Sequence, residues 1–413
     1  MPLKVLIAGG GIAGLTTALA CLKAGFTVHV FERASELSEI GAGIQIGPNA
    51  ARVMHALGLE TALGEVGSFP ALQEMRLGRS NTNIFRSPLG DAAIEKYGAP
   101  YYLLHRADLI TILGETLEAR SPGALMLGKT VSSYENNPSG ATLVFEDGSK
   151  AHGDVVIAAD GIHSTLRAAM MGAEEPRFTG NIVWRAMIPA SDRLRKLIPD
   201  SMCIWVGPEK HCVTYWLRGG QMINFVGAVE RDDWTEESWN SAGEKADFAA
   251  DFRGWSAPIT AAVEESRQCS RWALFDRDPQ PRWVDGNVVL VGDACHPMLP
   301  FLAQGAAMAI EDAWVLVAML EDMPSDIPAA LKRYEDLRLP RTAKVQSAAR
   351  ARMHSNHHRS GYRQLKEYVP MWLSSRLTPR TFEKRYQWLF AKNVIAESRR
   401  LHWIGDSDDS LFR

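Results

Sequence analysis

Short apolar runs and helix-like segments alternate along the start of the chain. Residues 4–8 are almost continuously apolar, which is typical of a strand buried on both faces. Residues 12–24 have the helical period and end at Gly25, and residues 27–32 again have the pattern of a strand. This order of strand, helix and strand predicts a βαβ unit with a parallel sheet.

The same patterns recur later and then change. They predict helices at 49–59, from 107 and at 305–320, and strands at 102–105, 143–148, 154–159 and 287–292. Between 178 and 273, stretches such as 212–216 and 222–228 alternate, which is typical of antiparallel strands with one packed face. We therefore predict an α/β fold in which a Rossmann-like domain (1–177, discontinuous with about 274–340) is interleaved with an antiparallel-sheet substrate domain (178–273), followed by a helical C-terminal region (341–413).

The tail beyond Tyr334 is predicted to be helical and basic. We interpret its cations as a charged helix face in solvent: Arg338, Arg341, Lys344, Arg350 and Arg352. Three histidines follow, without an acidic or cysteine ligand at a metal-binding spacing. We therefore predict no metal site and a solvated histidine cluster at His354, His357 and His358.

Composition limits the classes of partner. A formal net charge of -3 over 413 residues gives no reason to expect nucleic acid or an acidic membrane surface. No apolar stretch approaches the roughly 20 residues of a membrane span. The cysteines are odd in number and scattered, so we expect no disulfide framework and a cytoplasmic location. They are Cys21, Cys203, Cys212, Cys269 and Cys295.

A glycine motif connects the first predicted strand to the first predicted helix. Gly9, Gly11 and Gly14 fit Gly-x-Gly-x-x-Gly, in which the glycines allow a tight turn, a close approach to a pyrophosphate, and helix–strand packing. The free amides at the helix start then stabilise anionic phosphate. Glu32 ends the next strand, where its carboxylate can accept from ribose hydroxyls. Strand, motif, helix and acidic residue together predict dinucleotide binding.

Two later motifs end predicted strands and extend this site. Asp160-Gly161 and Gly292-Asp293 lie where backbone amides and carboxylates can reach a cofactor at the carboxyl edge of the sheet. Gly305 begins a helix whose amino end can stabilise negative charge, and Arg106 is a candidate charge partner for the pyrophosphate. Taken one by one, these residues could equally be an ordinary turn or a surface cation.

With all three motifs in this order, residues 4 to 350 resemble the single-component FAD-dependent aromatic hydroxylases of the para-hydroxybenzoate hydroxylase-like class. The resemblance implies that the Rossmann-like domain binds FAD, and that NADH or NADPH binds transiently as cosubstrate. It also implies the cofactor-binding residues, which are Gly9, Gly11, Ala13, Gly14, Glu32, Arg33, Gln45, Arg106, Val131, Asp160, Gly292, Asp293, Pro297 and Gly305.

Two segments are similar to one subgroup of this family. Residues 41–49, which begin at Gly41, and residues 296–305 resemble salicylate 1-hydroxylase, 3-hydroxybenzoate 6-hydroxylase and 6-hydroxynicotinate 3-monooxygenase. In the latter two, an active-site histidine and tyrosine are separated as His211 and Tyr215 are here. Positions four apart on a strand face the same side, so both can face one cavity. The alternative, a core Tyr215 and a surface His211, stays open.

The resemblance implies a FAD-dependent monooxygenase that hydroxylates a small phenolic aromatic acid with NAD(P)H and O2 through a flavin C(4a)-hydroperoxide. His211 is the candidate general base, Tyr215 is a candidate for orienting the substrate, and Pro297 could present a carbonyl to the flavin ring. Gln45 and Arg185 are weaker pocket candidates. We expect a salicylate or hydroxynicotinate type, NADH rather than NADPH, and a homodimer.

The alternatives are a 3-hydroxybenzoate type, a non-hydroxylating flavin oxidoreductase, and a non-catalytic FAD-binding protein. The hydroxynicotinate enzymes carry histidine where this chain has Gln45, and the 3-hydroxybenzoate enzymes have a glutamine near Pro300. The sequence therefore assigns neither the substrate, nor the hydroxylated position, nor whether decarboxylation accompanies the reaction.

Overall fold

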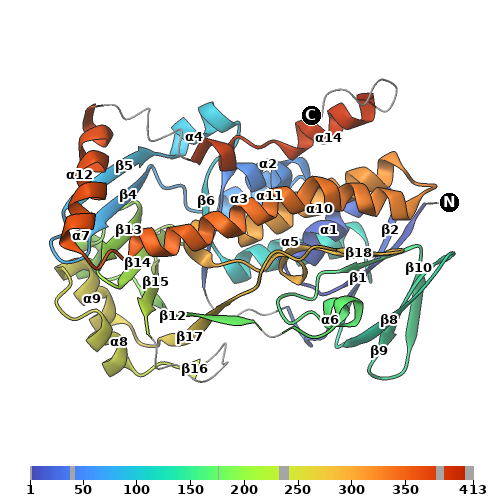
Figure 1. Ribbon diagram of the computed structural model, residues 1–413, viewed down its shortest axis with the longest axis horizontal. Coiled ribbons are helices and arrows are strands. Elements are labelled where there is room, and N and C mark those ends of the chain that lie inside the picture. The colour runs from blue at the N-terminus through green and yellow to red at the C-terminus, as the bar shows by residue number, and fades with distance from the viewer. Residues whose placement is uncertain (1, 38–41, 175, 232–240, 378–385, 405–413) are drawn as a thin grey trace.

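A computed structural model describes residues 2–37, 42–174, 176–231, 241–377 and 386–404. Gly41, with which the subgroup-like segment begins, lies outside the described residues, as do 378–385 and 405–413 of the C-terminal region. Figure 1 shows an elongated α/β molecule with two main sheets, and a long helix, α11 (Ile327–Asn356), passes both of them. The predicted α/β class is confirmed.

The predicted βαβ unit begins the parallel sheet. β1 (Lys4–Ala8) and β2 (Thr27–Glu32) pair in parallel and are joined by α1 (Ile12–Lys23). Both strands are largely buried, since α1 packs on them and is itself covered by α5 (Arg106–Arg120) and α10 (Gly305–Asp322). The six strands run in the order β18 (Val284–Asp285), β19 (Val288–Leu290), β11 (Val155–Ala158), β1, β2 and β7 (Leu125–Leu127).

The second main sheet is largely antiparallel and extends beyond residues 178–273. β4 (Leu72–Leu77) and β5 (Asn83–Pro88) come from early in the chain, and β13 (Met202–Gly207) pairs with β4 in parallel. This long-range pairing leaves no local pattern in the sequence, because alternation identifies a strand but not its neighbour. The eight strands run in the order β16 (Ser241–Ala242), β17 (Ser270–Asp276), β12 (Arg177–Pro189), β15 (Met222–Glu230), β14 (Lys210–Leu217), β13 (Met202–Gly207), β4 (Leu72–Leu77) and β5 (Asn83–Pro88).

Smaller elements complete the described chain. A two-stranded sheet, β3 (Gly43–Ile46) with β6 (Tyr102–His105), lies beside the second sheet, where β6 contacts β14. A three-stranded sheet is formed by β8 (Val131–Asn137), β9 (Gly140–Phe145) and β10 (Lys150–Gly153). The remaining elements are α2 (Pro48–Ala56), α3 (Glu60–Val66), α4 (Gly90–Tyr97), α6 (Thr165–Met171), α7 (Asp192–Leu197), α8 (Lys245–Asp251), α9 (Ala257–Glu265), η1 (Gly292–Ala294), η2 (Pro300–Leu302), α12 (Gly361–Leu377) and α14 (Val394–Ile404).

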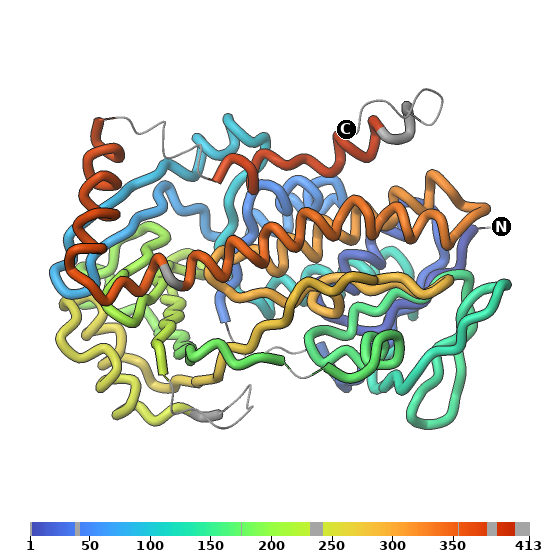
Figure 2. Tube along the Cα trace, in the orientation of Figure 1, coloured from blue at the N-terminus to red at the C-terminus, as the bar shows by residue number. Residues whose placement is uncertain are grey.

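The long helix α11 runs past both the parallel sheet and the second main sheet. Its 30 residues extend about 45 Å at 1.5 Å per residue, and Figure 2 shows it running along the longest axis. It contacts α10, β18 and η2. The prediction of a solvent-facing basic helix is wrong for much of it, because Arg338 is only 1% exposed and Arg352 8% exposed.

None of the helices in the described part of the chain is long and apolar enough to cross a membrane.

Candidate active site

The glycine turn between β1 and α1 combines dense packing with one open position. A β-carbon on Gly9 would lie 2.3 Å from the carbonyl oxygen of Ala159, and one on Gly14 would lie 1.9 Å from the carbonyl oxygen of Gly9. Gly9 also has a φ of +107°, which disfavours other residues. A β-carbon on Gly11 would meet no atom within 4 Å. Two glycines therefore serve packing, whereas Gly11 leaves room for a ligand at the start of α1.

Glu32 is held at the end of β2 by backbone amides. The amide of Gly10 donates to its Oε2 at 2.6 Å, and the amide of Ala34 donates to its Oε1 at 2.8 Å. Arg33 is exposed beside it. Val131 begins β8 two residues after Lys129, whose amide donates to the carbonyl oxygen of Glu32 at 2.8 Å. Glu32, Arg33 and the start of β8 therefore lie close together in space, and the Glu32 carboxylate is fixed near the glycine turn.

A cavity of about 300 Å³, here called the long cavity, begins at the glycine turn. The residues lining it come from α1, β3, α5, β12, β14, β15, the turn after β11 and the segment from η1 to α10. Those that the sequence predicted as site or pocket residues are Gly11, Ala13, Gln45, Arg106, Gly161, Arg185, Tyr215, Asp293 and Gly305. The first turn of the 18-residue helix α10 therefore borders this cavity, where its free amides favour negative charge.

Other predicted cofactor residues lie behind the wall of the long cavity. Asp160 is mostly buried, its Oδ2 accepts from the amide of Leu166 at 3.1 Å, and burial raises its pKa. The carbonyl oxygen of Pro297 accepts from the side-chain amide of Gln346 at 2.9 Å. Gly292 has a φ of +61°, and a β-carbon there would lie 3.0 Å from that of Ala13. These residues shape or support the wall.

A buried ionic cluster holds α10 against α11. Arg338 donates to Glu311 Oε2 and to Asp312 Oδ1, both at 2.7 Å. Arg341 and Asn49 also donate to Glu311. Burial alone would raise the pKa of Glu311, but the two arginines outweigh it and the pKa is lowered. The cluster therefore fixes α2, α10 and α11 relative to one another.

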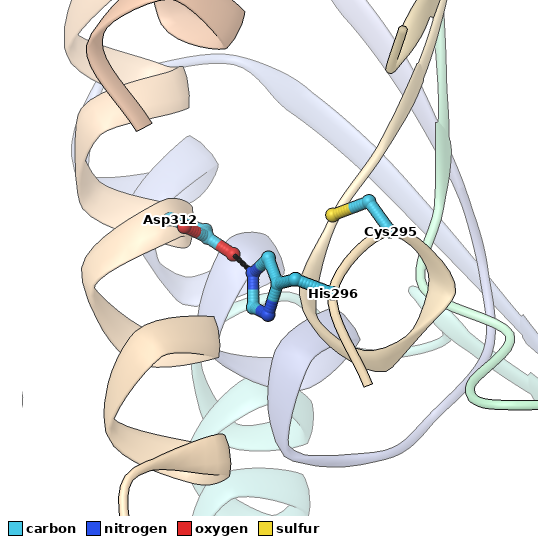
Figure 3. Close-up of side chains that lie close together, drawn as sticks. All are labelled: Cys295, His296 and Asp312. Atoms are coloured by element: carbon cyan, nitrogen blue, oxygen red, sulfur yellow. Dashed lines mark hydrogen bonds and ion pairs between the residues drawn. The ribbon is translucent and has the colours of Figure 1, made fainter. Parts of the chain in front are cut away.

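His296 joins this cluster. Its Nε2 lies 2.5 Å from Asp312 Oδ2. Figure 3 shows the His296 ring pointing toward Asp312, with Cys295 nearby. Among the described residues, these three have ligand atoms close enough to hold a metal. However, Asp312 already pairs with Arg338, and burial, followed by the nearby carboxylates, raises the pKa of the Cys295 thiol well above its usual value. Their chemistry fits an ion-paired structural cluster better than a metal centre.

A second, smaller space of about 70 Å³, here called the inner chamber, adjoins the long cavity. The two share Gln45, Val213, Val226, Pro300 and Ala303 as lining residues. Its walls are mostly apolar or aromatic, and its polar lining residues are Gln45, Gln73, Tyr101, His211, Arg352, Asn356 and Tyr386. A small aromatic molecule in this chamber would lie beside any ligand of the long cavity.

Tyr215 and Gln45 lie near the junction of the two spaces. Tyr101 donates from its hydroxyl to Gln45 Oε1 at 2.6 Å, and the amide of Gly43 donates to Asn224 Oδ1 at 2.8 Å. A β-carbon on Gly43 would lie 2.4 Å from the Tyr215 hydroxyl oxygen, so glycine permits this close approach. Burial raises the pKa of Tyr215, which keeps its hydroxyl protonated and able to donate.

His211 lines the inner chamber and is 5% exposed, so the alternative of a surface His211 is wrong. His211 and Tyr215 lie on the same strand and border the two adjoining spaces. Burial, followed by the nearby His357 and Arg352, lowers the pKa of His211 well below 6.5. The imidazole is therefore neutral near pH 7 and can accept a proton.

Two residues of the basic tail lie at this site, contrary to the prediction of a solvated face. His357 is 3% exposed, and its Nε2 lies 2.6 Å from Nδ1 of His211. Arg352 lines the inner chamber and donates to the Tyr386 hydroxyl at 3.2 Å. No acidic side chain of the described residues pairs with Arg352. The concentration of histidines near 354–358 was the only signal in the sequence, and the side chain of His354 is not described.

The glycine turn, Glu32 and the long cavity together have features that suit FAD. The open position at Gly11 and the amides of α1 suit a pyrophosphate, the fixed carboxylate of Glu32 suits a ribose, and the first turn of α10 suits a ring that becomes anionic. The inner chamber adjoins this cavity, and an imidazole, His211, and a cation, Arg352, are among its lining residues.

Comparisons with known proteins agree with this site. Residues 2–349 match the family described as FAD binding domain. The chain is 41% identical to a 3-amino-4-hydroxybenzoate 2-monooxygenase of Streptomyces platensis, over 86% of this chain and 88% of that protein. It is 38% identical to a 6-hydroxynicotinate 3-monooxygenase of Bordetella bronchiseptica, over 83% and 89%.

A solved structure described as a salicylate hydroxylase substrate complex superposes with a TM-score of 0.81 at 29% identity, over 96% of this chain and 97% of that chain. The expected subgroup is thus confirmed, and so is FAD as the cofactor. The chain therefore belongs to the FAD binding domain family and, within it, to the FAD-dependent aromatic monooxygenases.

Proposed function

We propose that this protein hydroxylates a small aromatic acid that carries a ring hydroxyl, using NAD(P)H and O2. The observation that carries this proposal is that His211 and Arg352 both line the small inner chamber. His211 is a neutral imidazole, and Arg352 is a cation without an acidic partner among the described residues. When bound, FAD accepts electrons from NAD(P)H and activates O2.

Each residue has a separate task in the proposed reaction. Arg352 binds the substrate carboxylate, because a buried guanidinium favours a charge-assisted hydrogen bond to an anion. His211 accepts the proton of the ring hydroxyl, which makes the ring richer in electrons and more reactive toward activated oxygen. Tyr215 and Gln45, near the junction of the two spaces, orient the ring. The apolar walls exclude water from the reacting atoms.

The names of the relatives support this class of substrate. 3-Amino-4-hydroxybenzoate and 6-hydroxynicotinate each combine a ring carboxylate with a hydroxyl on the same ring, as salicylate does. We propose that the substrate of this protein carries both groups on one ring and that NADH is the reductant. The proposal leaves the position of hydroxylation open.

The test is NADH consumption by the FAD-loaded protein across a panel of such acids, with product mass and CO2 release recorded. The panel contains 3-amino-4-hydroxybenzoate, 6-hydroxynicotinate, salicylate and 3-hydroxybenzoate, and benzoate is the matched control without a ring hydroxyl. We expect one hydroxy acid to accelerate NADH loss and to gain one oxygen atom. CO2 release would identify a decarboxylating hydroxylation. If NADH is consumed equally with and without every acid and only hydrogen peroxide forms, the protein is an oxidase and the proposal is wrong.

A further inference from the structure

Three side chains form a continuous hydrogen-bonded chain from the inner chamber toward the surface. Nδ1 of His211 lies 2.6 Å from Nε2 of His357, and Nδ1 of His357 lies 3.1 Å from Oε1 of Glu230. Arg359 donates to the other oxygen of Glu230, Oε2, at 2.7 Å. The two imidazoles are buried, whereas the Glu230 side chain is 23% exposed. The chain therefore joins a buried base to a carboxylate that solvent can reach.

The carboxylate sets the tautomers of both histidines. Glu230 is ionised near neutral pH, because hydrogen bonds from His357 and Arg359 outweigh burial and lower its pKa to about 2. A carboxylate can only accept, so Nδ1 of His357 carries the proton and its Nε2 accepts. Nδ1 of His211 must then donate to that nitrogen. This leaves Nε2 of His211 without a proton, as a base requires.

The charged neighbours of this chain come from four segments. Arg352 of α11 acts on His211 and favours the neutral imidazole. Arg359, beyond α11, pairs with Glu230 of β15 and also with Glu209, in the turn before β14. The aromatic ring of Phe301 in η2 packs 5.3 Å from the His211 ring. Glu230 is thus the acidic group in direct contact with His357, and it compensates a positive charge that forms on that ring.

We propose that His357 and Glu230 relay to solvent the proton that His211 takes from the substrate hydroxyl, an inference that rests on the proposed function. The hydroxyl proton moves to Nε2 of His211, the Nδ1 proton of His211 moves to Nε2 of His357, and the Nδ1 proton of His357 moves through Glu230 to water. One proton leaves, and no electrons are exchanged. Return of one proton to the product oxygen by the reverse transfers restores the starting tautomers. His357 and Glu230 act through His211 and are positioning residues.

The test follows ionisation of a bound ligand without turnover. The FAD-loaded full chain is mixed rapidly with 4-hydroxy-3-nitrobenzoate, whose phenolate is coloured, at a pH below the ligand's own pKa. The wild-type protein should form bound phenolate. His357→Gln keeps a hydrogen-bonding group beside His211 but breaks the relay, so phenolate formation should slow by about tenfold or more, with a smaller change in Kd. Glu230→Gln should act in the same direction.

Two matched variants control for structural effects. His358→Gln alters the neighbouring histidine, which pairs with Glu367, and Glu209→Gln alters the other partner of Arg359. Both should ionise the ligand at the wild-type rate. FAD stoichiometry and circular dichroism verify that each variant is folded, and Glu230→Gln carries the test if His357→Gln does not fold.

The outcomes separate the relay from the proposed function. If His357→Gln and Glu230→Gln form phenolate more slowly than the wild type but no acid of the panel gains oxygen, the proposed function is wrong, whereas the proton path from His211 through His357 and Glu230 is supported. If an acid gains oxygen while His357→Gln and Glu230→Gln ionise the ligand as fast as the wild type, the relay is wrong. Failure of the wild-type protein to form any bound phenolate also overturns the relay.

Discussion

Gly14 packs so closely on Gly9 that a β-carbon on Gly14 would lie 1.9 Å from the Gly9 carbonyl oxygen. Gly11, between them in the same turn, has no atom within 4 Å of the corresponding position. The three glycines of one motif therefore have different physical roles. Gly14 allows α1 to pack on its turn, whereas Gly11 keeps a wall of the long cavity open.

This difference predicts opposite effects of two alanine substitutions. Gly14→Ala should destabilise the protein by several kcal/mol even without FAD, because backbone must move to relieve the clash. Gly11→Ala should leave the melting temperature of the FAD-free protein almost unchanged but weaken FAD binding by about tenfold or more. Thermal unfolding without FAD and titration with FAD measure the two effects. Equal loss of FAD affinity without loss of stability in both variants would contradict this division.

The buried cluster around Glu311 predicts a pH-dependent contribution to stability. Glu311→Gln removes a negative charge that compensates the buried charges of Arg338 and Arg341. The substitution should therefore lower the free energy of unfolding by about 3–5 kcal/mol near neutral pH. Since the folded pKa of Glu311 is lowered, its contribution is present above the unfolded value near 4.3 and is lost as pH falls through the folded pKa. The free-energy difference from the wild type should therefore shrink below about pH 4.

Denaturant unfolding with saturating FAD at several pH values measures this difference. Asp336→Asn is the matched control, because this residue pairs with Lys332 on an exposed turn of α11 and should change stability by no more than about 0.5 kcal/mol. A Glu311→Gln variant as stable as the wild type at pH 7 would show that the arginines find other partners.

Local sequence patterns predicted the parts of the fold that depend on neighbouring residues. The bounds of β1 and β2, the start of α10 and the shared strand of His211 and Tyr215 follow from period and glycine position. They are reliable because a βαβ unit buries its strands within a short segment. The identity of the cofactor as FAD came from the family resemblance that three such motifs in a fixed order carry.

Long-range contacts could not be predicted in this way. The cations of α11 have the composition of a solvated helix, yet Arg338 is buried because Glu311 and Asp312 of α10 face it. Likewise His357 is buried because β14 and β15 bring His211 and Glu230 beside it. The sequence shows the charges but not the pairing, and a charged residue is buried only where its partner is.

The position of Arg352 in the inner chamber predicts that substrate binding depends on the carboxylate of the substrate. Arg352→Gln should raise KM for the accepted acid by about tenfold to a hundredfold with a smaller change in kcat, because it removes a charge-assisted contact made before the chemical step. The amide analogue of that acid should bind both proteins with similar affinity. Arg363→Gln, on the exposed side of α12, is the control for loss of one positive charge. Unchanged KM in Arg352→Gln would place the substrate carboxylate elsewhere.

The lowered pKa of His211 predicts how kcat/KM falls at acidic pH. Burial, followed by His357 and Arg352, lowers its pKa well below 6.5, so the free protein holds a neutral imidazole from about pH 6.5 upward. As pH falls through the folded pKa, His211 gains a proton and can no longer accept one from the substrate. kcat/KM, which reports the free protein, should therefore stay constant from about pH 6.5 to 8 and decline only at clearly lower pH.

The variant His211→Asn tests whether this decline belongs to His211. It should hydroxylate about a hundredfold or more slowly, keep its FAD, and lack the acidic limb. The exposed His152→Asn should behave as the wild type in both respects. A wild-type limb centred at or above pH 6.5, or the same limb in His211→Asn, would assign the essential ionisation to another group. A rate of hydroxylation in His211→Asn equal to that of the wild type would exclude His211 as the base.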